Sequence, residues 1–139
     1  MQHPLKLERI INKDAFAARI GKLTAGGYDA ARRPAIVEAF KNALADGKAE
    51  AEAMLMKDGS GMACAMRLSG LMDVLIAELF TLASTKVYPA DNRSSGERIA
   101  VTAVGGYGRG TLAPGSDIDL LFVLPWKQTA WGEQVIEYI

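Results

Sequence analysis

Two aspartates separated by a single residue are the part of this sequence best suited to chemistry. Asp117 and Asp119 begin an apolar run that continues to Leu124. Because side chains alternate along a strand, a strand beginning at Asp117 sends both carboxylates to one face, about 6 to 7 Å apart at the backbone. Their mutual repulsion requires a compensating charge, and Mg²⁺ binds such oxygen ligands while keeping water and phosphate oxygens. The pair therefore predicts a Mg²⁺ site that accepts a polyphosphate.

A glycine-rich stretch lies just before the aspartates and is suited to that polyphosphate. Gly105 and Gly106 directly follow a predicted strand, and their backbone can approach a phosphate closely because they lack side chains. The N-terminus of a following helix would also favour the anion. Arg109 supplies a positive charge and Ser116 a hydroxyl next to the first aspartate. These four residues are the candidate nucleotide-binding set.

Other glycine motifs fit this stretch less well. A Walker loop requires Gly-Lys-Ser/Thr after the glycines, and that sequence is missing here. A dinucleotide-binding fingerprint starting at Gly106 has Gly108 in place but Thr111 where the third glycine belongs. Its acidic residue should also close the next strand, whereas Asp117 opens it. The pattern therefore favours neither alternative.

A structural interpretation of the aspartates is a capped turn. Pro114 to Asp117 has the composition of a turn, so the Asp pair alone is as compatible with turn capping as with catalysis. Asp119 is harder to explain as a cap because it lies within a strand pattern flanked by apolar residues. The combined order of strand, Gly-Gly, short helix, turn and Asp-Ile-Asp favours a nucleotide site.

The elements that position these residues are predicted from hydrophobic periodicity. Residues 1–33 are expected to form a weakly structured leader, and residues 34–90 a helical region. Within that region the pattern predicts helices at residues 34–47 and 48–57. Residues 58–61 are either a break or a tolerated weak spot, and a helix with one continuous apolar face runs from Leu68 to Phe80.

The sequence becomes β-rich after the turn-forming residues 89–96. Strands are predicted at residues 98–104 and 117–124, the second ended by Pro125. A further helix containing Trp131 is expected after a cap near Thr129. These elements together predict an α+β fold.

Composition narrows the classes of function. The 139 residues are 50% hydrophobic and 23% charged, and Lys plus Arg equals Asp plus Glu at 16 each. This balance provides no positive field for nucleic acid or an anionic membrane. His3 is the only histidine, which excludes histidine-based metal clusters and Ser-His-Asp catalysis within the chain. The single cysteine, Cys64, and the lack of a signal peptide or membrane span predict a cytoplasmic protein.

The order of a hydrophobic strand, Gly105-Gly106, ten intervening residues and Asp117-Ile118-Asp119 resembles the signature of the polymerase-β-like nucleotidyltransferase superfamily. Within it, the stretch GGYGRGTLAPGSDIDLLF is similar to the version in the PII uridylyltransferase/uridylyl-removing enzyme family. The preceding helical region resembles the N-terminal region of that family at Arg67, Leu68, Ser69 and Asp73. The resemblance covers most of the chain after about residue 30 and is most specific from Val101 to Leu124.

This resemblance implies a fold and an activity. A helical N-terminal half would pack on the first strands of a nucleotidyltransferase mixed sheet, of which residues 97–139 are the truncated start. The enzyme would transfer UMP from UTP to a tyrosine hydroxyl of the trimeric PII signal protein in nitrogen regulation and release pyrophosphate. Asp117 and Asp119 would hold catalytic Mg²⁺, Gly105 and Gly106 would hold the triphosphate, and the other two candidates would assist.

The chain also departs from the family pattern. Family members use a third carboxylate on a later strand, but no strand is predicted after Leu124, and Glu133 and Glu137 lie in a predicted helix. The His/Asp phosphohydrolase domain for uridylyl removal and the glutamine-sensing ACT domains are missing. We therefore expect an N-terminal part of a longer bifunctional enzyme, incomplete for catalysis by itself.

Two other functions stay open at this point. The shared motif also fits another nucleotidyltransferase, such as a glutamine synthetase adenylyltransferase. Alternatively, the fragment binds nucleotide or a protein partner without catalysis.

Overall fold

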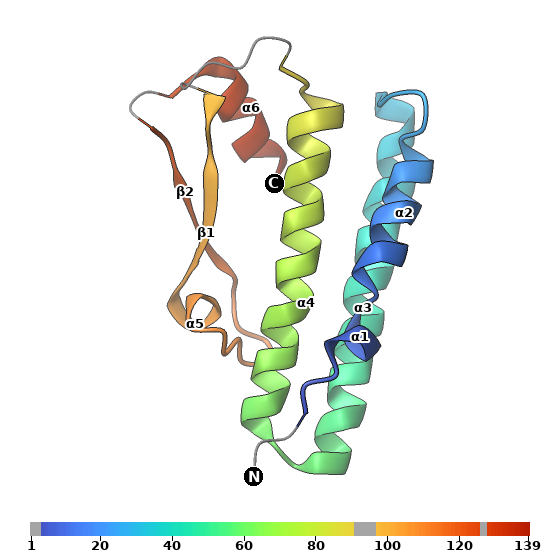
Figure 1. The fold of residues 1–139 in the computed structure, drawn as a ribbon, viewed down its shortest axis with the longest axis vertical. Helices are drawn as coiled ribbons and strands as arrows, with labels where there is room; N and C mark the ends of the chain where they lie inside the picture. Colours follow the sequence, from blue (N-terminus) through green and yellow to red (C-terminus); the bar gives the residue numbers. More distant parts are fainter. Residues whose placement is uncertain (1–3, 91–96, 126–127) are drawn as a thin grey trace.

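A hairpin of two long helices forms the centre of the structure, and a two-stranded sheet lies beside it (Figure 1). The computed structural model describes residues 4–90, 97–125 and 128–139. The long helices are α3 (Arg33–Asp58) and α4 (Gly61–Leu82). Strands β1 (Ala100–Val104) and β2 (Asp119–Val123) pair antiparallel. The α+β class predicted from the sequence is confirmed.

Of the two possibilities for residues 58–61, the structure has the break between two helices, and this break has a local cause. Gly59 ends α3 with a φ of 66°, a left-handed conformation that glycine adopts without steric cost, and its amide donates to the Leu55 carbonyl. Ser60 then caps α4 by accepting a hydrogen bond from the Ala63 amide at 3.1 Å. These two residues reverse the chain so that α4 packs along α3.

The prediction that a helix stops at Gly47 is wrong, because α3 continues through this residue. A Cβ at Gly47 would lie 2.6 Å from Cδ1 of Leu71 and 3.2 Å from the Ile10 carbonyl oxygen. Glycine is therefore present for close packing of α3 against α4 and the N-terminal segment. Tertiary packing outweighs its weak helix propensity, which costs about 1 kcal/mol relative to alanine.

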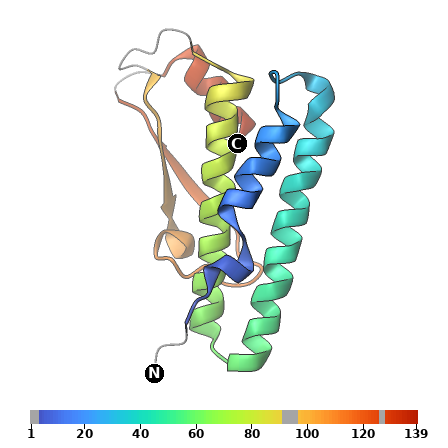
Figure 2. The same ribbon diagram turned by 45° about the vertical axis from the view of Figure 1, so that its right-hand side comes forward.

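The N-terminal segment is more ordered than the weakly structured leader that was predicted for residues 1–33. It contains α1 (Leu7–Ile10) and α2 (Lys13–Leu23), which lie against α3 (Figure 2). Phe16 and Ile20 of α2 are buried, and the Phe16 ring meets Phe40 of α3 edge to face at 5.0 Å. Burial against α3 stabilises α1 and α2 although the periodicity of this segment is weak. Residues 1–3, including His3, lie outside the described residues.

Arg67 of α4 ties the chain before α1 to the helical hairpin. Its side chain is only 1% exposed; it donates to the backbone carbonyls of Pro4 and Leu5 and pairs with Asp58 at 2.7 Å. A buried guanidinium needs such partners because desolvation of an unpaired charge is costly. Arg67 therefore has a structural role at the α3–α4 turn.

The apolar face predicted on α4 is confirmed by burial of Leu68, Leu71, Met72 and Leu75. A π-helical segment, η2 (Ala83–Val87), continues α4, and a short 3-10 helix, η1 (Ala30–Arg32), precedes α3. Within the described ranges, no helix is long and apolar enough to cross a membrane.

The sheet and its flanking helices complete the fold. One turn of helix, α5 (Gly105–Gly108), follows β1, and α6 (Ala130–Tyr138) follows β2. The cap predicted for α6 is confirmed, because the Thr129 hydroxyl accepts from the Gly132 amide at 3.0 Å. Residues 91–96, which hold most of the predicted boundary between the two halves, lie outside the described residues, as do residues 126–127.

Replacement of Gly47 by alanine is expected to destabilise the chain. The added methyl would press on Leu71, which is fully buried, and overpacking of this kind costs about 1 to 3 kcal/mol, more than the about 1 kcal/mol gained in helix propensity. Gly21→Ala is the matched control, because Gly21 is helical and has open space around its Cβ position. Urea unfolding should show a loss for Gly47→Ala and a gain of about 0.5 to 1 kcal/mol for Gly21→Ala; equal gains would contradict the packing role of Gly47.

Candidate nucleotide and metal site

The connection between β1 and β2 brings the glycine pair and one aspartate together. In the antiparallel register Val104 lies opposite Asp119, so the next residue, Gly105, lies beside the Asp119 carboxylate. A Cβ at Gly105 would lie 2.8 Å from Oδ2 of Asp119, and the φ of Gly105 is 64°. The left-handed backbone requires glycine here, and the Asp119 carboxylate occupies the space that a Cβ would take. The glycine and aspartate groups that were expected to form one site therefore lie next to each other at Gly105 and Asp119.

The rest of the glycine-rich stretch folds back on β1. The Thr111 amide donates to the Gly106 carbonyl at 3.1 Å. A Cβ at Gly108 would lie 2.6 Å from the Ala103 carbonyl oxygen, so this position also needs glycine. The predicted short helix is present as α5, but it spans a single turn. The dipole of such a short helix contributes little to anion binding. An anion would therefore be bound by individual backbone amides and side chains.

Gly106 differs from its neighbours because the fold leaves space at its Cβ position. The nearest atoms would be the Thr111 carbonyl oxygen at 3.6 Å and Nη2 of Arg109 at 3.8 Å, which are ordinary contact distances. The guanidinium of the exposed Arg109 therefore lies beside Gly106. An open glycine next to a cation is an arrangement that suits a phosphate group.

The turn predicted before the aspartates is present. The Ser116 amide donates to the Ala113 carbonyl at 3.1 Å, with Pro114 and Gly115 between them and a φ of 76° at Gly115. Proline followed by a glycine of positive φ is the arrangement of a type II turn. The turn directs the chain into Asp117, and it is therefore part of the structure that presents the aspartates.

The two aspartates are both exposed, but only Asp119 belongs to β2. The predicted strand start at Asp117 is wrong by two residues. Strand pairing ends at Val104 and Asp119, because Gly105 turns away and leaves Asp117 without a partner residue on β1. Side chains alternate along β2: Leu120 packs against the core, while Leu121 and Asp119 are exposed.

The sequence did not predict how this loop is attached to the helices. The Tyr107 hydroxyl donates to Oδ1 of Asp73 at 2.7 Å, and the Leu112 amide donates to Oγ of Ser69 at 2.9 Å. Burial, followed by the hydrogen bond to Asp73, raises the pKa of Tyr107 above its ordinary value, so its hydroxyl stays a donor. An aromatic residue inside a glycine-rich turn was a signal for burial, but its partner on α4 could not be read from the sequence.

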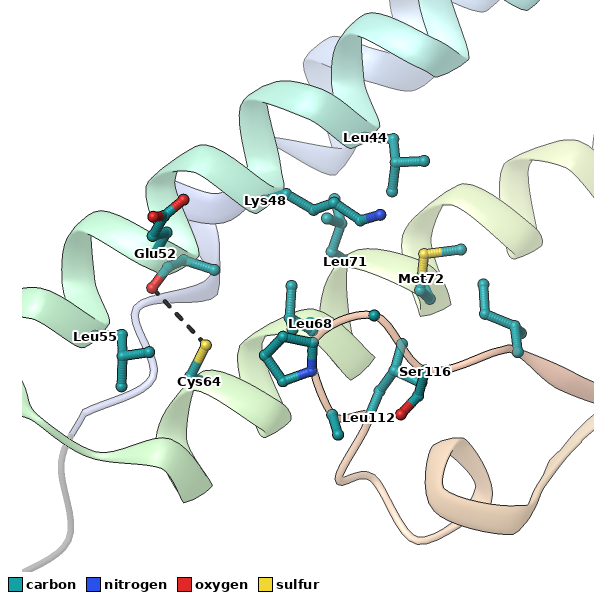
Figure 3. Close-up of a pocket in the computed structure, with 15 residues that line it drawn as sticks. Leu44, Lys48, Glu52, Leu55, Cys64, Leu68, Leu71, Met72, Leu112 and Ser116 are labelled. Atoms are coloured by element: carbon teal, nitrogen blue, oxygen red, sulfur yellow. Dashed lines mark hydrogen bonds between the residues drawn. The ribbon is translucent and has the colours of Figure 1, made fainter.

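A cavity of about 440 Å³ separates this loop from the helical hairpin (Figure 3). Its walls are mostly apolar side chains of α3, α4 and residues 112–118, with Lys48 and Glu52 on α3. Ser116 lines it from the loop, so this residue lies on the side facing the helices. The Cys64 thiol also lines the cavity, and burial raises its pKa, so the thiol stays protonated.

Comparisons with known proteins find a sequence match for the region that contains this site. Residues 90–139 match the family model of the nucleotidyltransferase domain. This part of the chain is therefore similar to nucleotidyltransferase domains. Over 113 residues, 81% of its length, the chain is 53% identical to a bifunctional uridylyltransferase/uridylyl-removing enzyme of Rhodopseudomonas palustris, and it spans 12% of that relative. No solved structure shows a significant match.

The donor groups of this nucleotidyltransferase region fit Mg²⁺. Asp117 and Asp119 provide carboxylate oxygens, and Mg²⁺ commonly uses one or two carboxylates together with water and substrate phosphates. Across the described residues, no group of three or more His, Cys, Asp or Glu side chains is placed to hold a metal ion. Two carboxylates in an open position suit an ion that takes its other ligands from water and a polyphosphate.

The two adjacent glycines of the nucleotidyltransferase region should respond differently to alanine. Gly105→Ala places a methyl against the Asp119 carboxylate in a left-handed backbone and should cost about 1 to 2 kcal/mol of stability. Gly106→Ala meets only ordinary contacts and should change stability by less than about 0.5 kcal/mol. Urea unfolding of both variants measures this difference, and a loss at Gly106 as large as at Gly105 would argue against the observed loop conformation.

Proposed function

We propose that this chain is the N-terminal part of a PII uridylyltransferase/uridylyl-removing enzyme and carries the metal- and triphosphate-binding portion of its transferase site. The observation that carries the proposal is the close approach of Gly105 to the Asp119 carboxylate. It places a backbone suited to phosphate beside a ligand suited to the accompanying cation. The 53% identity to a uridylyltransferase supports the choice of family member. A cytoplasmic location is part of the proposal.

The proposed reaction transfers UMP from UTP to a tyrosine of the PII protein. The tyrosine oxygen attacks the α-phosphorus, the bond from that phosphorus to the β-phosphate oxygen breaks, pyrophosphate leaves, and the hydroxyl proton is lost to solvent. Charge therefore accumulates on the phosphates as the bond breaks.

Each residue of the site has a defined task in this reaction. Gly105 and Gly106 let the backbone approach the triphosphate, and Arg109 compensates its charge. Asp117 and Asp119 would hold Mg²⁺, which supplies charge stabilisation and alignment of the phosphates when bound. Ser116 is proposed to contact the triphosphate through its hydroxyl. The longer protein would supply the remaining acid and the site for PII.

Calorimetry distinguishes uridylyl transfer from the two remaining alternatives. UTP with Mg²⁺ is expected to bind the longer protein, with ATP at least about tenfold weaker, a difference of about 1.4 kcal/mol. A preference for ATP would instead indicate an adenylyltransferase. Failure of both nucleotides to bind would leave a protein-binding role. Gly106→Ala should weaken UTP binding without unfolding the protein, since the fold tolerates alanine there.

Neutralisation of either aspartate should abolish transfer while leaving the fold. Asp117→Asn and Asp119→Asn keep the side-chain size but remove the charge that holds Mg²⁺, and a loss of at least about 100-fold in kcat is expected in the full-length enzyme. Glu133→Gln on α6 is the matched control, because Glu133 is an exposed carboxylate on a different element. Transfer at the normal rate in an aspartate variant would remove that residue from the metal site.

A further inference from the structure

Two residues of α4 hold the loop that contains the proposed site. Ser69 and Asp73 are four residues apart, so their side chains lie on the same face of the helix. Ser69 accepts from the Leu112 amide at 2.9 Å, and Asp73 accepts from the Tyr107 hydroxyl at 2.7 Å. Both contacts join segments that are distant in sequence. Tyr107 belongs to α5, and Leu112 precedes the Ala113–Ser116 turn.

The two contacts attach opposite sides of the site. Tyr107 is bonded directly to Gly106, on the side of the glycines. Leu112 immediately precedes the Ala113–Ser116 turn that leads into Asp117, on the side of the aspartates. Four residues along α4 correspond to about 6 Å. A single rigid helix thus holds both sides of the loop, in addition to the strand pairing that places Gly105 beside Asp119.

Burial makes the hydrogen bond between Leu112 and Ser69 hard to replace, whereas the bond between Tyr107 and Asp73 is partly buried because Asp73 is exposed. Ser69, Tyr107 and Leu112 are only 4%, 5% and 6% exposed. Water has little access to the Leu112 amide, so loss of the serine hydroxyl would leave a buried donor unsatisfied. A cavity of about 440 Å³ lies next to them, and Tyr107 and Leu112 themselves belong to the hydrophobic core.

We propose that Ser69 and Asp73 are positioning residues of the transferase site, which hold Tyr107 and Leu112 and thereby align the glycine side with the aspartate side. The proposal rests on the proposed function, because it concerns the alignment of the same site. The two residues touch the loop and not the substrate, so they act through the backbone that they anchor.

The test is steady-state kinetics of the full-length enzyme with single substitutions. Ser69→Ala, Tyr107→Phe and Asp73→Leu each remove one anchor, and we expect an increase of roughly tenfold in KM for UTP and in the Mg²⁺ concentration for half-maximal activity. Asp73→Asn keeps a carbonyl oxygen that accepts from Tyr107 and should restore values within about twofold of the unmodified enzyme.

Two control variants separate alignment from general stability. Ser84→Ala removes a buried hydroxyl that donates to the Phe80 carbonyl of its own helix, and Tyr88→Phe removes a hydroxyl from an aromatic cluster around Tyr138. Both should leave KM and the Mg²⁺ midpoint unchanged. If the anchor variants lower only thermal stability and active-enzyme yield, as a purely structural contact would, the proposal is overturned.

Hydrogen exchange separates failure of this inference from failure of the proposed function. In the full-length protein, amides of residues 105–116 should exchange roughly tenfold faster in Ser69→Ala and Tyr107→Phe, while amides of α3 keep their protection. If the unmodified protein never transfers UMP, the proposed function fails and exchange alone decides whether the anchors hold the loop. If exchange at residues 105–116 stays unchanged in both variants, the inference fails whatever the activity.

Discussion

Burial of one face of α4 is the interaction on which the rest of this structure depends. Leu68, Leu71, Met72 and Leu75 are removed from water on this face, and each such side chain contributes about 1.5 to 3 kcal/mol. Close approach of α3 is possible because Gly47 leaves room for Leu71. The resulting hairpin supports α1 and α2 and presents other residues of α4 to the sheet.

The sheet depends on this hairpin because two strands alone have marginal stability in water. β1 and β2 are paired at five positions, which defines how the two strands lie against each other. Strand pairing does not determine how the sheet is placed relative to α4. It is provided by Leu120, by the two hydrogen bonds to Ser69 and Asp73, and by α6, whose Trp131 donates to the Tyr88 carbonyl.

The candidate site contains glycines packed against neighbouring atoms as well as residues that are open to solvent. At Gly105 and Gly108 a Cβ would lie against a carboxylate and a strand carbonyl, so the fold leaves little room for a side chain at either position. At Gly106 the space beside the backbone is open, so a ligand could approach the backbone there. Exposed carboxylates at Asp117 and Asp119 stay hydrated without a cation, so the fold does not need a metal to offset their desolvation. The loop is therefore ordered, while Gly106 and the two carboxylates are accessible to a charged ligand.

Local chemistry determined much of this protein from the sequence alone. The break at Gly59 and Ser60, the turn at Pro114 and Gly115, the cap at Thr129 and the apolar face of α4 were predictable, because each depends on a few neighbouring residues. The motif from Gly105 to Asp119 likewise predicted the candidate site. Its specific residue roles stay predictions.

Only the tertiary structure decided the remaining features. Gly47 has the same local signature as a helix stop, and its packing against Leu71 is what keeps it inside α3. The same holds for α2, whose order comes from burial against α3, and for the start of β2, which is set by where β1 ends. Contacts of Ser69 and Asp73 with the loop span 43 and 34 residues. No local pattern encodes such pairs, because they exist only once the separate elements have packed together.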